Sequence, residues 1–180
     1  METKPANYLL QYGLISGAAG IVTYLVLYLG GAEWMTSPAA FATSLVPIIF
    51  AVLGVLAVRK SNGGFIDFGD ALKNSFGIFV IGGLMVTLFS YLLINFIDPD
   101  FKQAMQQASM EMTEKMLKRF NLPQDQIDKA VEEATKKDNF SIGNVLLGFA
   151  FTCFLWFLFS LIIALILKKK NPNAGMPQTL

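Results

Sequence analysis

The stretch RKSNGGFIDFGDALKNS, residues 59 to 75, holds the densest group of side chains that could do chemistry. It places two adjacent glycines, two aspartates and several cationic or amide side chains between two long apolar runs. A phosphate-binding loop would need a glycine, four further residues and then Gly, Lys and Ser or Thr, set between a strand and a helix. This stretch offers neither that spacing nor a strand, so the phosphate-loop interpretation fails.

The same residues fit a turn that leads into a helix. Residues 61–64, Ser-Asn-Gly-Gly, tolerate or favour positive φ. Asp67 comes three residues before Asp70, in an arrangement similar to a capping box that places acid at a helix N-terminus. The spacing therefore predicts that a helix begins near Phe68.

Two interpretations of this loop remain. In the one we favour, Phe65, Ile66 and Phe68 anchor the loop in the membrane interface, and Arg59 and Lys60 reach toward lipid phosphate. In the other, the charged residues form a mouth for ion or solute passage, or a docking surface for another protein. The residues of this candidate interaction or interfacial loop are Arg59, Lys60, Gly63, Gly64, Phe65, Asp67, Phe68, Asp70 and Lys73.

Other catalytic chemistry has little support in the sequence. The chain contains no histidine, so it lacks the commonest general base and the commonest transition-metal ligand. Its one cysteine, Cys153, lies in a long apolar run, where we expect inert packing. The net charge of +1 gives no basic surplus for nucleic acid. We therefore expect no catalytic residue, cofactor, metal or nucleic-acid partner.

The elements that position the loop are membrane spans. With 54% hydrophobic and 15% charged residues and a mean hydropathy of +0.52, the chain is too apolar for an ordinary soluble domain. A hydrocarbon core about 30 Å thick needs about 20 apolar residues in a helix. Four segments have that length and no charged residue: Tyr8 to Gly30, Ala39 to Val58, Phe76 to Ile97 and Val145 to Leu167.

The predicted fold class is therefore all-α, an integral membrane four-helix bundle. We expect one membrane domain over residues 1–170, with spans at approximately 8–30, 39–58, 68–97 and 145–167, and a flexible tail over 171–180. Small residues at helical spacing predict close packing of the spans, with self-association as the alternative. These helix-packing positions are Gly13, Gly17, Gly20, Ala40, Ser44, Ala51, Gly54 and Gly83, and Pro47 is expected to bend the second span.

The polar segment 98–144 predicts an extramembrane helical hairpin between the third and fourth spans. Asp98 is expected to cap a helix that has Pro99 at its first position. Acid and lysine residues four apart recur along the segment and favour helix, over Phe101 to Phe120 and Pro123 to Lys137. The apolar faces of the two helices should cover each other or the membrane surface. A methionine-rich docking groove for a partner is the alternative.

Basic residues set the expected orientation. The connection from Gly31 to Pro38 has no Lys or Arg, whereas Arg59, Lys60 and Lys73 lie in the second connection and residues 168–170 are all Lys. The N- and C-termini should then face the cytoplasm, with the loop 98–144 extracytoplasmic.

The loop and the spans together resemble a known family. The sequence NGGFIDFGDALKNSF, preceded by VRK, is similar to the signature loop of the bacterial membrane-protein family "domain of unknown function 4199". The glycine-rich first span and the acid- and lysine-rich insertion before the fourth are similar to it as well. The resemblance covers essentially Tyr8 to Lys170. Its pattern positions are Gly13, Gly17, Gly63, Gly64, Phe68 and Ala71, with Leu72 where Phe is frequent. It implies the four-span architecture and a bacterial inner (cytoplasmic) membrane, and no activity.

A structural or accessory, protein-interacting membrane component is the leading functional interpretation, because the spans lack the ionisable side chains that proton relays and ion coupling require. The expected partners are membrane lipid, another membrane protein or a second copy of the chain. The alternative is a small channel or transporter subunit that acts as an oligomer, with Thr87, Ser90, Asn95 or Asn144 as its polar lining. We expect no enzyme activity, because no nucleophile and base are paired at membrane depth.

Overall fold

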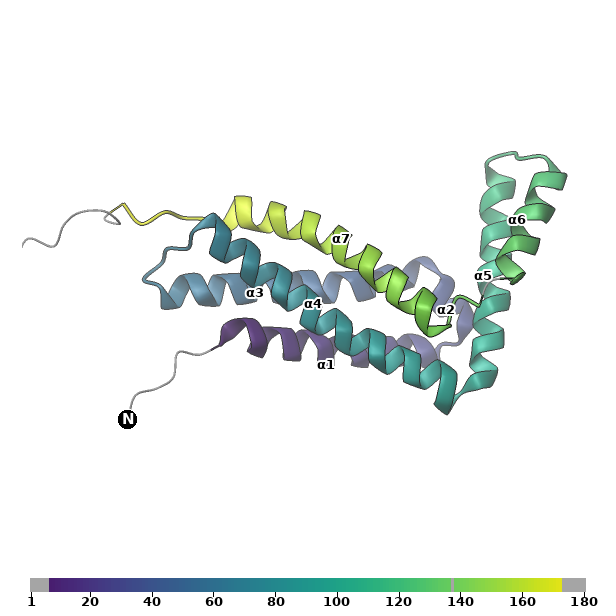
Figure 1. The fold of residues 1–180 in the computed structure, drawn as a ribbon, viewed down its shortest axis with the longest axis horizontal. Coiled ribbons are helices and arrows are strands. Elements are labelled where there is room, and N and C mark those ends of the chain that lie inside the picture. Colours follow the sequence, from purple (N-terminus) through teal and green to yellow (C-terminus); the bar gives the residue numbers. More distant parts are fainter. Residues whose placement is uncertain (1–6, 137, 173–180) are drawn as a thin grey trace, which may run out of the picture.

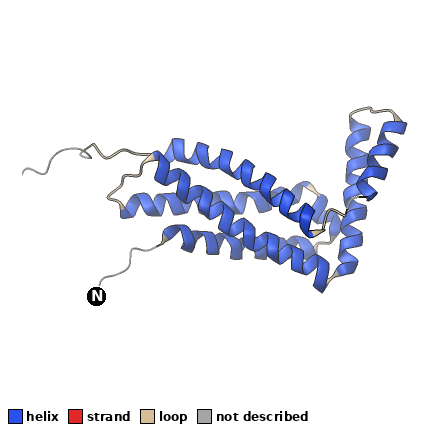
Figure 2. Ribbon diagram, viewed as in Figure 1, coloured by secondary structure: helices blue, strands red, loops and turns tan. Residues whose placement is uncertain are grey.

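The computed structural model describes residues 7–136 and 138–172 of the 180-residue chain, with residues 39, 42 and 134–136 described by their backbone only. The described residues form helices, joined by short turns, and no strand (Figure 2). The helices are α1 (Tyr8–Leu29), α2 (Ala32–Thr36), η1 (Pro38–Phe41), α3 (Ala42–Ser61), α4 (Phe68–Leu92), η2 (Leu93–Ile97), α5 (Pro99–Arg119), α6 (Gln124–Lys136) and α7 (Ile142–Leu167).

Four of these helices are long and apolar enough to cross a membrane, which confirms the predicted all-helical bundle of four spans. They are α1, α3, α4 with its continuation η2, and α7. Helix α4 is central, because it packs against each of the other three (Figure 1). The start of α1, the turn between α3 and α4 and the end of α7 lie at one end of the bundle. Helices α2, α5 and α6 lie at the other end.

The observed helix bounds differ from the expected ones in the second and fourth spans. Helix α3 begins at Ala42 rather than 39, because Pro38 starts a 3-10 turn, and it continues to Ser61. Its last turn carries Arg59 and Lys60, which are favourable beside the partial negative charge of a helix C-terminus. Helix α7 begins at Ile142 rather than 145. The five-residue helix α2 has no counterpart in the sequence interpretation.

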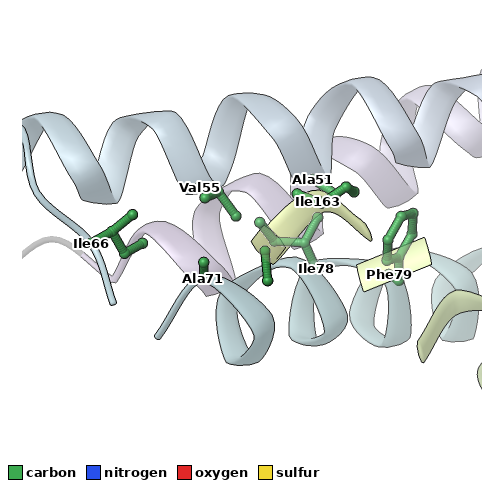
Figure 3. Close-up of a cluster of buried hydrophobic side chains, with 8 residues drawn as sticks. Ala51, Val55, Ile66, Ala71, Ile78, Phe79 and Ile163 are labelled. Carbon is green, nitrogen blue, oxygen red and sulfur yellow. The ribbon is translucent and has the colours of Figure 1, made fainter. Parts of the chain in front are cut away.

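The largest cluster of buried side chains extends from the α3–α4 turn to the middle of the spans (Figure 3). Ile78 and Phe79 of α4 are fully buried there, together with Ala51 and Val55 of α3. Within a membrane the lipid is as apolar as the side chains, so helix association depends on close van der Waals packing rather than on leaving water. Small residues at these crossings let α3 and α7 approach α4 closely.

Helices α5 and α6 lie side by side across the far end of the bundle, and their long axes run across those of the spans (Figure 1). Two of the predicted pairs on α5 form ion pairs, Glu111–Lys115 at 3.8 Å and Glu114–Lys118 at 2.6 Å. Such exposed pairs add a few tenths of a kcal/mol each, about 0.2–0.5. Of the expected tail over 171–180, all but residues 171 and 172 lie outside the described residues.

Candidate functional site

The loop of residues 59–73 begins as a helix C-cap. Gly63 and Gly64 have φ values of +69° and +92°, in the left-handed region that favours glycine. The Gly64 N–H donates to the Arg59 carbonyl at 2.9 Å, and the Arg59 Nε donates to the Gly64 carbonyl at 3.0 Å. The paired glycines therefore turn the chain back onto the last turn of α3, and Arg59 is used to hold that turn.

The second half of the loop binds the chain segment that follows α7. Ile66 and Lys169 exchange two backbone hydrogen bonds, 2.9 Å from the Ile66 N–H and 2.8 Å from the Lys169 N–H. The Ile66 side chain is only 3% exposed and belongs to the buried core (Figure 3). The expectation that Ile66 anchors the loop in the membrane interface is therefore wrong. The side chain closes the end of the bundle, because the bridge to Lys169 holds it inward.

The charged residues of the loop point to solvent. Lys60, Asp67, Asp70 and Lys73 are exposed. Asp67 does occupy the N-cap of α4, but its side chain makes no capping hydrogen bond, so the predicted capping box does not form. Helix α4 nevertheless begins at Phe68, as the sequence spacing predicts.

A shallow hollow of about 410 Å³ lies beside the loop, between Phe65, Asp67, Asp70 and Lys170. The Lys169 Nζ lies 5.5 Å from the centre of the Phe65 ring, within the range of a cation–π contact. The hollow offers carboxylates and amines for recognition of a polar group, but it brings together no nucleophile and base. The hollow lies where the loop is hydrogen-bonded to the segment after α7, and its geometry fits that structural role.

The predicted helix-packing residues fall into two groups. A Cβ added at Gly13 or Gly20 would lie 2.9 Å from Ile81 Cβ or 2.7 Å from Val86 Cγ2, and Gly17 meets Met85, so these three glycines bring α1 against α4. The second group lies where α3 and α7 contact their neighbours. A Cβ added at Gly54 of α3 would meet Ile78 and Tyr12, and one added at Gly83 of α4 would meet the Trp156 ring of α7. Ala51 of α3 is fully buried.

Two of the predicted packing positions on the second span, Ala40 and Ser44, do not pack in this way. Ala40 lies in the 3-10 turn before α3, and Ser44 is exposed. Ala40 is excluded because helix α3 begins only at Ala42, whereas Ser44 lies within α3 but beside α7, with which α3 makes little contact.

The far end of the bundle holds contacts that the sequence interpretation missed. The Tyr28 hydroxyl of α1 donates to Asp98 Oδ2 at 2.6 Å, and Asp98 Oδ1 accepts the Phe101 N–H at 3.0 Å, which caps α5 as predicted. The rings of Tyr28 and Phe101 lie 4.7 Å apart, edge to face. The hydrogen bond from Tyr28 and that from the Phe101 N–H lower the pKa of Asp98.

Three further contacts fix the residues just before α7. The Asn95 Nδ2 donates to the Phe140 carbonyl at 3.2 Å, and Lys102 forms an ion pair with Asp138 at 2.7 Å. The hydrogen bond from Lys102 lowers the pKa of Asp138. Asn144 likewise donates to the Asp138 carbonyl at 2.8 Å. Asn95 and Asn144, considered above as channel lining, therefore tie this turn to the bundle.

A groove of about 530 Å³ separates α2 and η1 from one face of α5. Met112 and Met116 line it, with Glu111, Lys115 and Arg119 beside them. Met112 is 47% and Met116 is 48% exposed, and Phe120, at the end of the same helix, is 71% exposed. This surface, called the α5 groove below, combines uncovered apolar area with charges of both signs.

Within residues 7–136 and 138–172, no three His, Cys, Asp or Glu side chains lie close enough together to hold a metal ion. The structure thus defines the class of protein, a helical bundle with four candidate membrane spans and two further helices, α5 and α6, that lie across one end. A family model described as "Protein of unknown function (DUF4199)" matches residues 11–169, so the chain belongs to that family, as its loop and spans suggested. No curated protein and no solved structure matches the chain.

Proposed function

We propose that the protein is an accessory membrane component whose four spans serve as the anchor and whose α5–α6 pair binds a partner protein. The observation that carries this proposal is the α5 groove, where the other described residues leave large apolar side chains uncovered. Exposed apolar area rimmed by charged residues is typical of an interaction surface.

The attachment of α5 to the bundle supports a presenting role. Its first turn is tied to α1 through Tyr28 and Asp98, and Lys102 pairs with Asp138 just before α7. The half of α5 that carries Met112 and Met116 extends away from these ties (Figure 1). A helix that is fixed at its first turn and leaves part of one face exposed further along can hold a preformed surface toward a partner, which reduces the ordering cost of binding.

The chemistry of the groove favours an amphipathic helix as the partner segment. Methionine side chains adapt to different apolar surfaces. Glu33 and Glu111 lie on the same groove as Lys115 and Arg119, so a segment with both signs of charge would find counter-charges. We propose that this helix belongs to another protein of the same membrane.

The proposed location is a bacterial inner membrane, with both termini in the cytoplasm and the α5–α6 pair outside as an extramembrane hairpin. The lysines at 168–170, with Arg59 and Lys60, all lie at the bundle end opposite α5 (Figure 1), in agreement with the tendency of basic residues to stay in the cytoplasm. Because the long axis of α5 runs across the long axes of the spans, the hairpin would lie along the membrane surface. We propose no enzymatic role, which the absence of histidine supports.

Photocrosslinking in the native membrane tests the proposal. A p-benzoylphenylalanine residue is placed at Met112 or Met116, and as a matched control at Gln103, which is exposed and lies nine residues from Met112, on the opposite face of α5. Gently extracted adducts are identified by native mass spectrometry. We expect both groove positions, but not Gln103, to crosslink to the same second polypeptide in equal amount.

The same experiment separates the other outcomes. Crosslinks only to a second copy of the chain would favour self-association and the oligomeric channel or transporter instead. Adducts of lipid alone at Met112 and Met116 would assign the groove to the membrane surface and contradict the accessory role. A Met112→Asp variant, which adds charge without enlarging the side chain, should lose the second polypeptide while keeping the same thermal stability.

A further inference from the structure

A cavity of about 240 Å³ with a mixed polar and apolar lining lies between α1, α3, α4 and α7. The hydroxyl-bearing residues Ser16, Thr43, Ser44, Thr87 and Thr152 line it, and the Trp156 ring forms part of its wall. The cavity belongs neither to the loop of residues 59–73 nor to the α5 groove.

The cavity arises from how the helices are arranged. Helices α3 and α7 both pack against α4, but they touch each other only slightly. Gly82 and Gly83 of α4 also line the space, but a Cβ added there would meet Ser16 or the Trp156 ring, so these two glycines admit α1 and α7 rather than leave the space open. The gap lies instead between α3 and α7, which do not pack closely against each other.

Ser16 is the residue that marks the cavity as unusual. Three serines in the described spans are buried, and two of them, Ser75 and Ser160, donate to the carbonyl four residues earlier at 2.8 Å. Ser16 is 2% exposed, yet its Oγ has no hydrogen-bond partner among the residues that the structure describes. The Oγ lies against Gly82, 2.9 Å from where a Cβ would stand. Because an unpaired buried hydroxyl is costly, a partner from outside the chain would remove that cost.

The lining restricts the chemistry of such a partner. The cavity residues are uncharged, and a charged group there would lack a counter-charge at membrane depth. Hydroxyl groups can donate and accept, so they suit a hydroxyl or carbonyl group. The flat face of Trp156 suits an apolar body. The volume lies just below the about 300–1,000 Å³ usual for ligand pockets, which favours a small molecule.

The surroundings indicate how the molecule would enter. Ser44 is exposed at the edge of the cavity, and its neighbour Leu45 on α3 is 59% exposed. On α7, Phe151 and Leu155, one residue before and three residues after Thr152, are exposed as well. An opening bordered by such apolar side chains faces hydrocarbon rather than water.

From these observations we infer that the cavity binds a small, uncharged, membrane-soluble molecule that carries a hydroxyl or carbonyl group. The ligand hydrogen-bonds to Ser16 Oγ and packs on the Trp156 ring. It enters sideways from the lipid, between α3 and α7. This binding site does not depend on the accessory role proposed above.

The probe for the test is 2,2,2-tribromoethanol, an uncharged alcohol whose bromine atoms quench tryptophan fluorescence. The chain has two tryptophans, so a Trp34→Phe background leaves Trp156 as the only reporter. The full-length protein is titrated in lipid nanodiscs. We expect a saturable quenching component above the linear background. Ser16→Ala should raise its apparent Kd about tenfold, the effect of losing one hydrogen bond.

Two variants complete the design. Ser75→Ala is the matched control, since it removes an equally buried hydroxyl that is already bonded within its own helix, and it should leave the apparent Kd within about twofold. Thr87→Leu fills the cavity and should abolish the saturable component. Linear quenching in every protein would mean a cavity that holds only water and would overturn the inference. Equal Kd values for Ser16→Ala and Ser75→Ala would overturn it as well, whether or not Thr87→Leu folds.

Discussion

Asp98 is the residue on which several elements depend. Its carboxylate caps α5 and accepts the Tyr28 hydroxyl of α1, so one side chain joins the first span, the end of the third and the helix that carries the α5 groove. Sequence inspection suggests the cap, because Asp followed by Pro is a frequent helix start. The contact with Tyr28, seventy positions away, depends on the packing of α1 against α4.

The lowered pKa of Asp98 predicts an acid-sensitive end of the bundle. Because the folded state favours the carboxylate, the stabilisation is complete above the ordinary pKa of 3.8 and is lost as the pH falls through and below that value. The thermal midpoint of an Asp98→Asn variant should therefore fall less than that of the unmodified protein between about pH 7 and about pH 3.

The measurement is thermal unfolding followed across that pH range in an uncharged detergent. Asp100→Asn serves as the control, since Asp100 is exposed in the same first turn of α5. The unmodified protein and the Asp100→Asn variant should show similar acid sensitivity. Parallel curves for the unmodified protein and Asp98→Asn would contradict the assignment.

Gly83 is the glycine where added volume should do most harm. A Cβ there would overlap the Trp156 ring, which stacks on Phe79 with 5.7 Å between the ring centres. Gly83→Ala should therefore displace the ring and destabilise the bundle by about 1–3 kcal/mol, the usual cost of overpacking. The measurement is the thermal midpoint of the purified variant in detergent.

Gly69 provides the matched control, because it lies on the same helix α4 and a Cβ added there would meet nothing within 4 Å. Gly69→Ala should leave the midpoint unchanged or raise it slightly, since alanine favours helix over glycine by about 0.5–1 kcal/mol. If the two variants are equally stable, α4 and α7 do not pack as closely as the structure places them.

At the scale of elements, the bridge between Ile66 and Lys169 connects the α3–α4 turn to the segment after α7. Lys169→Pro removes the N–H that donates to the Ile66 carbonyl at 2.8 Å. Loss of one such bond costs about 0.5–1.5 kcal/mol, so the turn should open more often. We expect faster amide hydrogen exchange at Ile66 and faster tryptic cleavage after Lys60.

Lys169→Ala is the control for this change. It keeps both backbone bonds and removes only the cation beside the Phe65 ring. Exchange at Ile66 should then stay close to that of the unmodified protein. If the Ile66 amide hydrogen exchanges at the same rate in the alanine and proline variants, the bridge does not hold the turn.

The elements also show which features could be predicted from the sequence. Uninterrupted apolar runs predict the four long helices, and the positions of Phe68 and Asp98 predict two helix starts, because these signals are local. The Ile66–Lys169 bridge joins residues far apart in the chain, and no local sequence pattern pairs the two. The bridge depends on the relative positions of α4 and α7, which no local sequence pattern contains.

Local sequence patterns also did not predict features that depend on contacts with neighbouring helices. Leu93 to Ile97 forms a π-helical turn, η2, in a run that reads as ordinary helix. The small residues on α3 indicated one packing face, but Ser44 lines a cavity because α3 and α7 separate there. A stripe of small residues permits close approach, and it does not determine which gap a neighbouring helix fills.

At the scale of the whole molecule, the two ends of the bundle differ in character. One end holds the paired glycines, the Ile66–Lys169 bridge and the lysines of residues 168–170. The other holds α2, α5 and α6, with the α5 groove and the contacts of Asp98. A partner bound at α5 and a ligand in the cavity would therefore occupy different levels of the same bundle.

This asymmetry predicts the orientation of the chain in its membrane. Single cysteines are introduced at Ser61, beside the glycine turn, and at Gln107 on α5, both of which are exposed. The background is Cys153→Ala, which removes the one native cysteine. Basic residues stay preferentially in the cytoplasm, so a membrane-impermeant maleimide added to intact cells should label Gln107→Cys and spare Ser61→Cys.

Lysing the cells should make Ser61→Cys equally reactive, which shows that the site was protected by the membrane and not by the fold. The reverse pattern in intact cells would place the α5 groove in the cytoplasm. The seven Lys and Arg residues within 98–144 weigh weakly against the predicted orientation, since acidic residues accompany them and long loops cross membranes largely regardless of charge. The basic residues beside the glycine turn then predict which side of the membrane the α5 groove faces.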